Sequence, residues 1–152
     1  MFTFFASDSE SMSEPTKAKS QPGRKRKPLI YVVDDEVLLL DLAEASLQAG
    51  GYSIKKFHDP EEALKSFLRE KTKPDLLISD YAMGKMHGLE LIEKCKQAHP
   101  PLKTMLVSGT AGAEIILDAP VKVERFLGKP YQPATLLETV RRVLKPEGNA
   151  RG

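Results

Sequence analysis

Polar residues stand at the ends of four short apolar runs of this chain. Asp34 and Asp35 follow LIYVV, Asp80 ends LLISD, Ser108 ends MLVS and Lys129 follows RFLG. Three carboxylates brought together repel one another, which raises their pKa values unless a cation lies among them. Oxygen ligands in an incomplete cage suit Mg²⁺, which keeps several waters and accepts phosphate oxygens. A lysine and a hydroxyl beside such a cage could hold a phosphoryl group.

Each of these residues has an ordinary explanation when it is taken alone. Asp80 could simply begin a turn, as aspartate often does. Asp34, Asp35 and Ser108 could cap helices, and Lys129 could be a solvated turn residue. Their joint occurrence at the ends of successive strands is harder to obtain by chance, so we interpret them as one site.

The elements that must position these residues are strands and helices in alternation. Apolar runs predict five strands, at 29–33, 52–57, 76–80, 102–107 and 125–128. Helical spacing and capping residues predict five helices, over 37–49, from 60 onward, over about 87–98, over 113–117 and from 133 onward. Strict alternation of this kind is typical of an α/β fold with helices on both faces of a parallel sheet.

We therefore predict a flavodoxin-like, doubly wound five-stranded parallel sheet with strand order 2-1-3-4-5. The predicted strands are nearly continuous apolar runs, as strands buried on both faces should be. This order places the ends of the first and third strands side by side, where ligands bind in open α/β sheets.

Apolar residues recur at helical spacing in the predicted helices. In the first helix they are Val37, Leu40, Leu47 and Leu38, Leu42, Ala45. In the second helix, Ala63, Leu64, Phe67 and Leu68 are expected to form the buried face. Gly50-Gly51 should end the first helix, and Asp59 with Glu62 should form a capping box at the start of the second.

Composition indicates one soluble domain without a membrane segment. The chain has 152 residues, of which 41% are hydrophobic and 29% charged. No apolar run approaches the roughly 18 residues that a spanning helix needs. The single cysteine, Cys95, cannot form an internal disulfide and is expected to be a small core residue, which fits a cytoplasmic protein.

Charge and composition divide the chain into three parts. Residues 1–28 hold six basic and three acidic residues, for a net charge of +3, and the remainder is near neutral at −1. We predict a disordered basic leader over 1–28, a folded domain over 29–145 and a flexible tail over 146–152. Met12 offers an alternative start. The run GRKRKP could bind nucleic acid or an anionic membrane, although such runs are more often solvated linkers.

Four sequence pieces together resemble the receiver domain of two-component response regulators, the CheY-like superfamily. They are YVVDDE, LLISDYAMGKMHGLELI, MLVSGTAG and RFLGKPYQP. The resemblance covers about residues 29–145. It departs from the family's pattern at Gly84, where proline is usual, so we expect the loop after Asp80 to be more mobile. The segment between Ser108 and Phe126 is short, which leaves the length of the fourth helix open. Only a few residues follow the last predicted helix, so we expect a stand-alone receiver without an output domain.

The resemblance implies a role for each residue of the site. Asp80 matches the phosphoacceptor, Asp35 a direct metal ligand, and Asp34 an acidic residue that acts mostly through water. Ala82 matches the position whose backbone carbonyl completes the metal shell. Three further matches are Ser108 with the switch hydroxyl, Phe126 with the switch aromatic, and Lys129 with the lysine that precedes a cis proline, here Pro130.

The function that follows from the resemblance is a Mg²⁺-dependent phosphoacceptor switch. A histidine kinase or phosphotransfer protein would donate the phosphoryl group to Asp80. The surface of helix 4, strand 5 and helix 5 would then bind a downstream protein or a second copy of the chain. No DNA-binding domain is expected, and no enzyme activity beyond the chain's own phosphorylation and dephosphorylation.

Three other functions compete with this interpretation. A phosphorylation-independent binding module of the same fold would need none of the five site residues. A haloacid-dehalogenase-like phosphatase also uses an aspartate at a strand end, but it needs a second acid where Ala82 stands. A nucleic-acid binder would depend on Arg24–Lys27, and deletion of residues 1–28 would test this alternative.

Overall fold

The computed structural model describes residues 26–110 and 112–145. The predicted tail and residues 1–25 of the predicted leader lie outside the described residues. Arg26 forms an ion pair with Asp75 at 3.2 Å, and the backbone N–H of Leu29 donates to the same carboxylate at 2.8 Å. These contacts fix the point at which the described chain enters the sheet.

Within the described residues, five strands alternate with four α-helices and one short 3-10 helix. The strands are β1 (Leu29–Val33), β2 (Ser53–Phe57), β3 (Leu76–Asp80), β4 (Lys103–Ser108) and β5 (Arg125–Gly128). The helices are α1 (Val37–Ala49), α2 (Pro60–Arg69), α3 (Gly88–Ala98), the 3-10 helix η2 (Ala113–Ile116) and α4 (Pro133–Leu144). No helix of the described part is long and apolar enough to cross a membrane.

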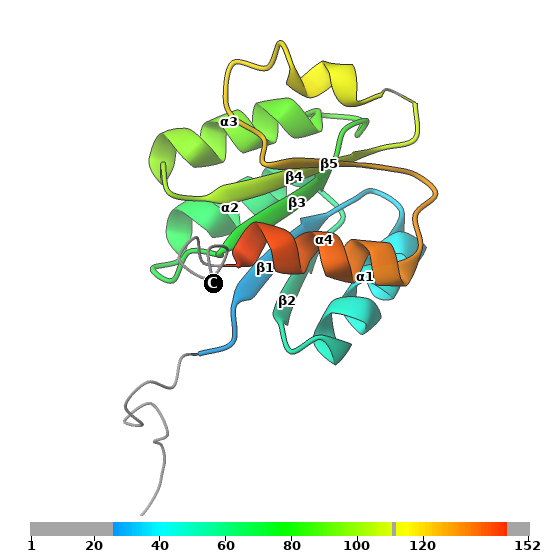
Figure 1. The fold of residues 1–152 in the computed structure, drawn as a ribbon. Helices are drawn as coiled ribbons and strands as arrows, with labels where there is room; N and C mark the ends of the chain where they lie inside the picture. The colour runs from blue at the N-terminus through cyan, green and yellow to red at the C-terminus, as the bar shows by residue number, and fades with distance from the viewer. Residues whose placement is uncertain (1–25, 111, 146–152) are drawn as a thin grey trace, which may run out of the picture.

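All strands pair in parallel in the order β2-β1-β3-β4-β5. This is the predicted flavodoxin-like order, and Figure 1 shows the sheet between two layers of helices. β1 lies between β2 and β3. From β1 the chain adds β2 on one side, and it then crosses over to add β3, β4 and β5 in turn on the other side. The carboxyl ends of β1 and β3 therefore lie side by side, as predicted.

Two apolar cores, one on each face of the sheet, hold the layers together. Alternate residues of β1 divide between them: Tyr31 and Val33 join α2 and α3, and Ile30 and Val32 join α1 and α4. Side chains of a strand alternate between the two faces, so both faces must be apolar when helices cover both. Cys95 is buried in the α2–α3 core, as predicted.

Local signals end and begin the helices largely as expected. Gly51 follows α1 with a positive φ of 97°, a conformation that glycine adopts without strain. Asp59 caps α2 by accepting a hydrogen bond from the backbone N–H of Glu61 at 2.9 Å. Pro60 occupies the first turn of the helix, where its missing N–H costs no hydrogen bond.

One of the five predicted helices, the short one, is not an α-helix. The segment expected over 113–117 forms only the four-residue 3-10 helix η2, which buries none of its own residues fully. Gly112 precedes this turn and Pro120 follows it, so little chain is left for an α-helix before β5 begins.

Helical spacing does not by itself mark the buried stripe of α1, and the predicted buried face of α2 is wrong at Leu68. In α1 the buried residues are Leu40, Ala43 and Leu47, whereas Val37 and Leu38 are 58% and 70% exposed. The helix rests on the sheet and on α4 along a single stripe, so apolar residues outside that stripe face solvent. Leu42, at 49% exposure, and Leu68 of α2, at 55%, lie outside their stripes for the same reason.

Candidate functional site

Four strands deliver the predicted site residues to one edge of the sheet. Val33 pairs with Ser79, so the next residues along β1 and β3, Asp34 and Asp80, are neighbours. In the adjoining pair of strands, Ser108 at the end of β4 pairs with Gly128 at the end of β5. Lys129 directly follows Gly128. The parallel register thus gathers residues that lie far apart in the sequence.

Three carboxylates form an acidic cluster at this edge. Asp34, Asp35 and Asp80 each place an oxygen within 4.8 Å of the others. Asp34 and Asp80 are buried, whereas Asp35 is exposed, so the cluster opens to solvent on one side. A small set of oxygen ligands with an open side fits Mg²⁺, which retains waters when it binds proteins. These residues therefore have the chemistry to hold that ion.

Lys129 lies against the acidic cluster. Its Nζ is 3.1 Å from Asp34 Oδ2, 3.2 Å from Asp80 Oδ1 and 3.6 Å from Glu36 Oε1. The sequence interpretation did not include Glu36, although it directly follows the acidic pair. One ammonium thus contacts three carboxylates, and Asp35 lies close to two of them. The site therefore retains negative charge that a bound cation would offset.

The pKa values reflect this excess of negative charge. Burial, followed by the charge of Asp34, raises the pKa of Asp80 to about 6, against the opposing effect of Lys129. Burial also raises the pKa of Asp34, although the N–H of Glu36 and the ammonium of Lys129 oppose it. For Lys129, burial lowers the pKa, but Asp34 and Asp80 outweigh it and raise the value. Ionising both buried carboxylates is therefore costly without a second cation.

Ser108 is buried beside the lysine. Its carbonyl oxygen accepts a hydrogen bond from the backbone N–H of Lys129 at 2.9 Å, and its Oγ accepts one from the N–H of Thr110 at 3.2 Å. The backbone bond ties the end of β4 to the residue that contacts Asp80. A shift in the position of either residue is therefore transmitted to the other through this backbone hydrogen bond.

The loop after Asp80 is held closely against the strand ends. Tyr81 N–H donates to the carbonyl of Val107 at 2.7 Å, and Gly88 N–H donates to the carbonyl of Tyr81 at 2.8 Å. A Cβ on Gly88 would lie 2.4 Å from the carbonyl oxygen of Asp80. Only glycine fits there, because any side chain would push against the backbone of the site. The sequence analysis did not identify this close approach of Gly88 to the site.

The remaining predicted residues lie around this centre. Phe126 is half-buried on β5, opposite Leu106, three residues before Lys129. The Lys129–Pro130 peptide is cis, as the resemblance implied. Ala82 is exposed in the loop that follows β3, and the metal role of its carbonyl stays a prediction.

Comparison with known proteins agrees with this geometry. Residues 30–141 match the response regulator receiver domain family. The chain is 30% identical over 119 residues to the alkaline phosphatase synthesis transcriptional regulatory protein PhoP of Bacillus subtilis, covering 76% of this chain and 48% of that protein. It is 31% identical over 124 residues to the DNA-binding transcriptional regulator NtrC of Escherichia coli, covering 78% of this chain and 25% of that protein. The chain thus spans half or less of these two relatives.

Solved structures show the same likeness. A CheY-like receiver domain protein from Methanospirillum hungatei is 29% identical with a TM-score of 0.71, and the match covers 83% of this chain and 99% of that one. The receiver domain of NtrX from Brucella abortus is 28% identical with a TM-score of 0.69, and the match covers 78% and 99%. The chain belongs to the response regulator receiver domain family.

Proposed function

We propose that this chain is a phosphoacceptor switch in which Asp80 receives a phosphoryl group from a protein phosphohistidine. The observation that carries the proposal is the position of Asp80. Its buried carboxylate lies within 4.8 Å of two further carboxylates and 3.2 Å from the ammonium of Lys129. A binding module that worked without phosphorylation would have no use for this costly arrangement of buried charge.

The transfer is a substitution at phosphorus. A carboxylate oxygen of Asp80 bonds to the phosphorus as the bond to the donor imidazole nitrogen breaks, and that nitrogen keeps the electron pair. Asp34 and Asp35 with Asp80 would hold Mg²⁺, which supplies charge neutralisation for the phosphoryl oxygens. Lys129 exchanges its contact with Asp80 for one with a phosphoryl oxygen, so the ammonium stays paired throughout.

The same residues link the site to the surface. The new phosphoryl group offers acceptors to the hydroxyl of Ser108, and Lys129 moves with the group to which it pairs. Ser108 ends β4 and Lys129 directly follows β5. Phe126 of β5 packs against the same core as Ile115 and Ile116 of η2. Phosphorylation would bias an existing equilibrium between two arrangements of these elements. The surface of η2, β5 and α4, which corresponds to the predicted surface of helix 4, strand 5 and helix 5, then binds a downstream protein or a second copy of the chain.

The proposal extends to the partners and the chemistry of this chain. A histidine kinase or phosphotransfer protein is the donor, and the setting is the cytoplasm. The chain turns over no substrate of its own, since it catalyses only its own phosphorylation and dephosphorylation. The phosphatase alternative lacks support because Ala82 offers no second acid near Asp80.

Phosphorylation by a small donor tests the proposal directly. The full chain is incubated with acetyl phosphate and Mg²⁺, and its intact mass is measured. We expect one phosphoryl group on the wild type and none on Asp80→Asn, with labelling lost when the metal is chelated. Equal labelling of the two proteins would show that the acceptor is another residue.

A further inference from the structure

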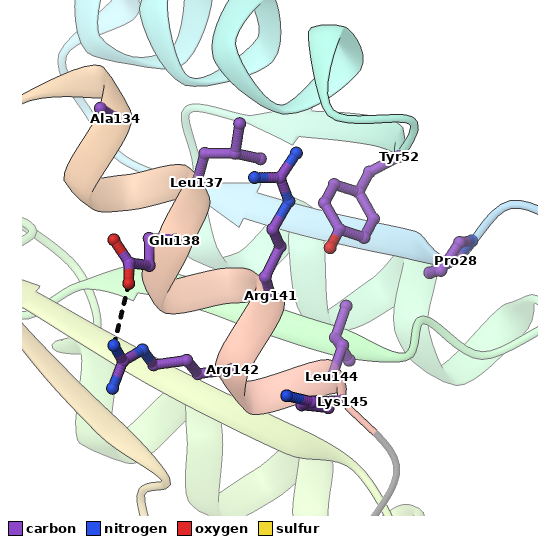
Figure 2. Close-up of a pocket in the computed structure, with 9 residues that line it drawn as sticks. All are labelled: Pro28, Tyr52, Ala134, Leu137, Glu138, Arg141, Arg142, Leu144 and Lys145. Atoms are coloured by element: carbon purple, nitrogen blue, oxygen red, sulfur yellow. Dashed lines mark hydrogen bonds and ion pairs between the residues drawn. The ribbon is translucent and has the colours of Figure 1, made fainter. Parts of the chain in front are cut away.

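A groove of about 860 Å³ lies between α4 and the starts of β1 and β2, at the edge of the sheet away from Asp80. Figure 2 shows Leu137, Arg141 and Leu144 of α4 on one side and Tyr52 on the other. Lys145, directly after α4, also lines the groove. The surface therefore combines apolar side chains with basic ones, and it contains none of the residues of the phosphoacceptor site.

The basic residues of this groove differ in whether they are neutralised. Arg142 pairs with Glu138 at 2.9 Å. Arg141 and Lys145, by contrast, form no hydrogen bond or ion pair with any residue that the structure describes. Two uncompensated positive charges beside apolar side chains suit a ligand that carries both apolar groups and carboxylates.

A second groove of the molecule does not offer the same combination. It lies between α1 and the loop after β5, encloses about 470 Å³ and is lined mainly by apolar residues such as Leu39 and Leu42. The only basic residue lining it is Lys129, which already pairs with Asp34, and the acidic Glu36 lines it as well. An acidic ligand would be repelled there.

The first residues of this chain have the chemistry that the α4 groove requires. Phe2, Phe4 and Phe5 are half of the six phenylalanines of the chain, and every charged residue from there to position 14 is acidic: Asp8, Glu10 and Glu14. Aromatic residues are depleted in segments that never bury their side chains. An aromatic trio followed by acids thus matches apolar Tyr52 and Leu137 beside unpaired cations.

We propose that residues 1–14 bind in the α4 groove of the same chain. The described chain begins at residue 26, and Pro28 is one of the residues that line the groove. The eleven residues 15–25 would serve as the linker, and a linker of that length reaches roughly 17–20 Å. Such a short tether gives an effective concentration in the millimolar range, so even weak contacts suffice for binding.

Hydrogen exchange on the full chain tests the proposal. In the variant with Phe2, Phe4 and Phe5 changed to serine, we expect several-fold faster exchange over 50–54 and 137–145 than in the wild type. A chain that begins at Met12 lacks the three aromatics and should behave like this variant. Exchange in β4 should not change. Equal exchange over the groove in all three chains would overturn the proposal.

Charge reversal provides an independent arm. Arg141→Glu with Lys145→Glu should give the same loss of protection, and reversal of Asp8, Glu10 and Glu14 to lysine in that background should restore it. Lys65→Glu, an exposed reversal on α2, is the matched control and should have no effect. Failure of the restored pair to regain protection would show that the charges do not contact one another.

Dilution separates binding within one chain from binding between copies. Protection that is constant over a hundredfold range of protein concentration supports binding within the chain. Protection that falls on dilution would mean that the segment binds a second copy, which overturns the proposal. All variants should still accept a phosphoryl group on Asp80, because the changed residues lie outside that site.

Discussion

At the scale of single residues, the main property of the site is that its carboxylates outnumber its cations. Of the basic residues that the structure describes, Lys129 alone forms ion pairs with Asp34, Asp80 and Glu36, and both aspartates are buried. A charged Asp80 is therefore a cost to the metal-free fold. The same cost is what makes the site ready for a cation and a phosphoryl group.

Asp80→Asn should stabilise the metal-free protein at neutral pH. The pKa of Asp80 is raised to about 6 in the fold, above its ordinary value, so its ionisation costs folding free energy that grows as the pH rises from about 4 to 6. We expect a gain of about 1–2 kcal/mol at pH 7.5, reduced from the full shift because Lys129 loses a partner.

Urea unfolding of both proteins with a metal chelator measures this gain. The difference between wild type and Asp80→Asn should shrink at pH 4.5, where the wild-type carboxyl is largely protonated in the fold. A difference as large at pH 4.5 as at pH 7.5 would contradict the assigned pKa.

Gly88→Ala should destabilise the protein and slow phosphorylation. The added Cβ would lie 2.4 Å from the carbonyl oxygen of Asp80 and 2.7 Å from Leu106 Cδ1, and overpacking of this kind costs roughly 1–3 kcal/mol. Gly84→Ala, four residues earlier in the same loop, is the control, because nothing lies within 4 Å of its Cβ position. Thermal melting and the labelling rate with acetyl phosphate measure both effects. Similar losses in the two variants would show that the loop, and not the contact with Asp80, matters.

At the scale of elements, β5 is the link between chemistry and surface. It is an edge strand that pairs only with β4, and it carries Phe126 and leads directly to Lys129. At its other end, Glu124 is fixed by hydrogen bonds from Thr104 N–H and Lys96 at 2.7 and 3.2 Å. One end of the strand is therefore anchored while the other follows the site.

Lys129→Ala should separate phosphorylation from the change of surface. The carboxylate cluster remains, so some phosphorylation should survive, but the contact that draws β5 toward the phosphoryl group is lost. A ligand without differential contacts to two states cannot shift them. Hydrogen exchange over 109–131, with and without a stable phosphoryl mimic, should change in the wild type and stay constant in the variant. The same change in both would show that Ser108 alone drives the switch.

At the scale of the whole molecule, the two ends of the parallel strands carry different chemistry. The carboxylates and Lys129 gather at the carboxyl ends of the strands. The α4 groove, with Arg141 and Lys145, lies near the amino ends of β1 and β2. The net charge of residues 29–152 is close to zero, so it does not reveal that acidic and basic groups are separated in this way. The two edges can therefore bind unlike partners without direct competition.

Metal binding should stabilise the domain as a whole, because an ion that binds only the folded state shifts the unfolding equilibrium. Mg²⁺ should raise the melting temperature of the wild type, and Asp35→Ala should abolish the rise. Asp35 is exposed, so its removal leaves the core intact and relieves repulsion within the cluster. A variant that melts lower and still responds to Mg²⁺ would mean that Asp35 is not a ligand.

The strand order, and the gathering of the candidate site residues at the carboxyl ends of the strands, follow from the sequence alone. Continuous apolar strands alternating with helices allow few topologies, and each site residue directly follows or ends a strand, so their convergence did not depend on fine geometry. Asp34, Asp80, Ser108 and Lys129 could all be predicted for this reason.

Features that depend on contacts between distant segments could not be predicted from the sequence. Helical spacing marks apolar residues but not the stripe that meets the sheet, so the exposure of Val37 and Leu38 was not foreseen. The contact of Glu36 with Lys129 and the approach of Gly88 to Asp80 join separate loops. The 3-10 turn at 113–116 likewise reflects how much chain remains between β4 and β5 once both strands are fixed in the sheet.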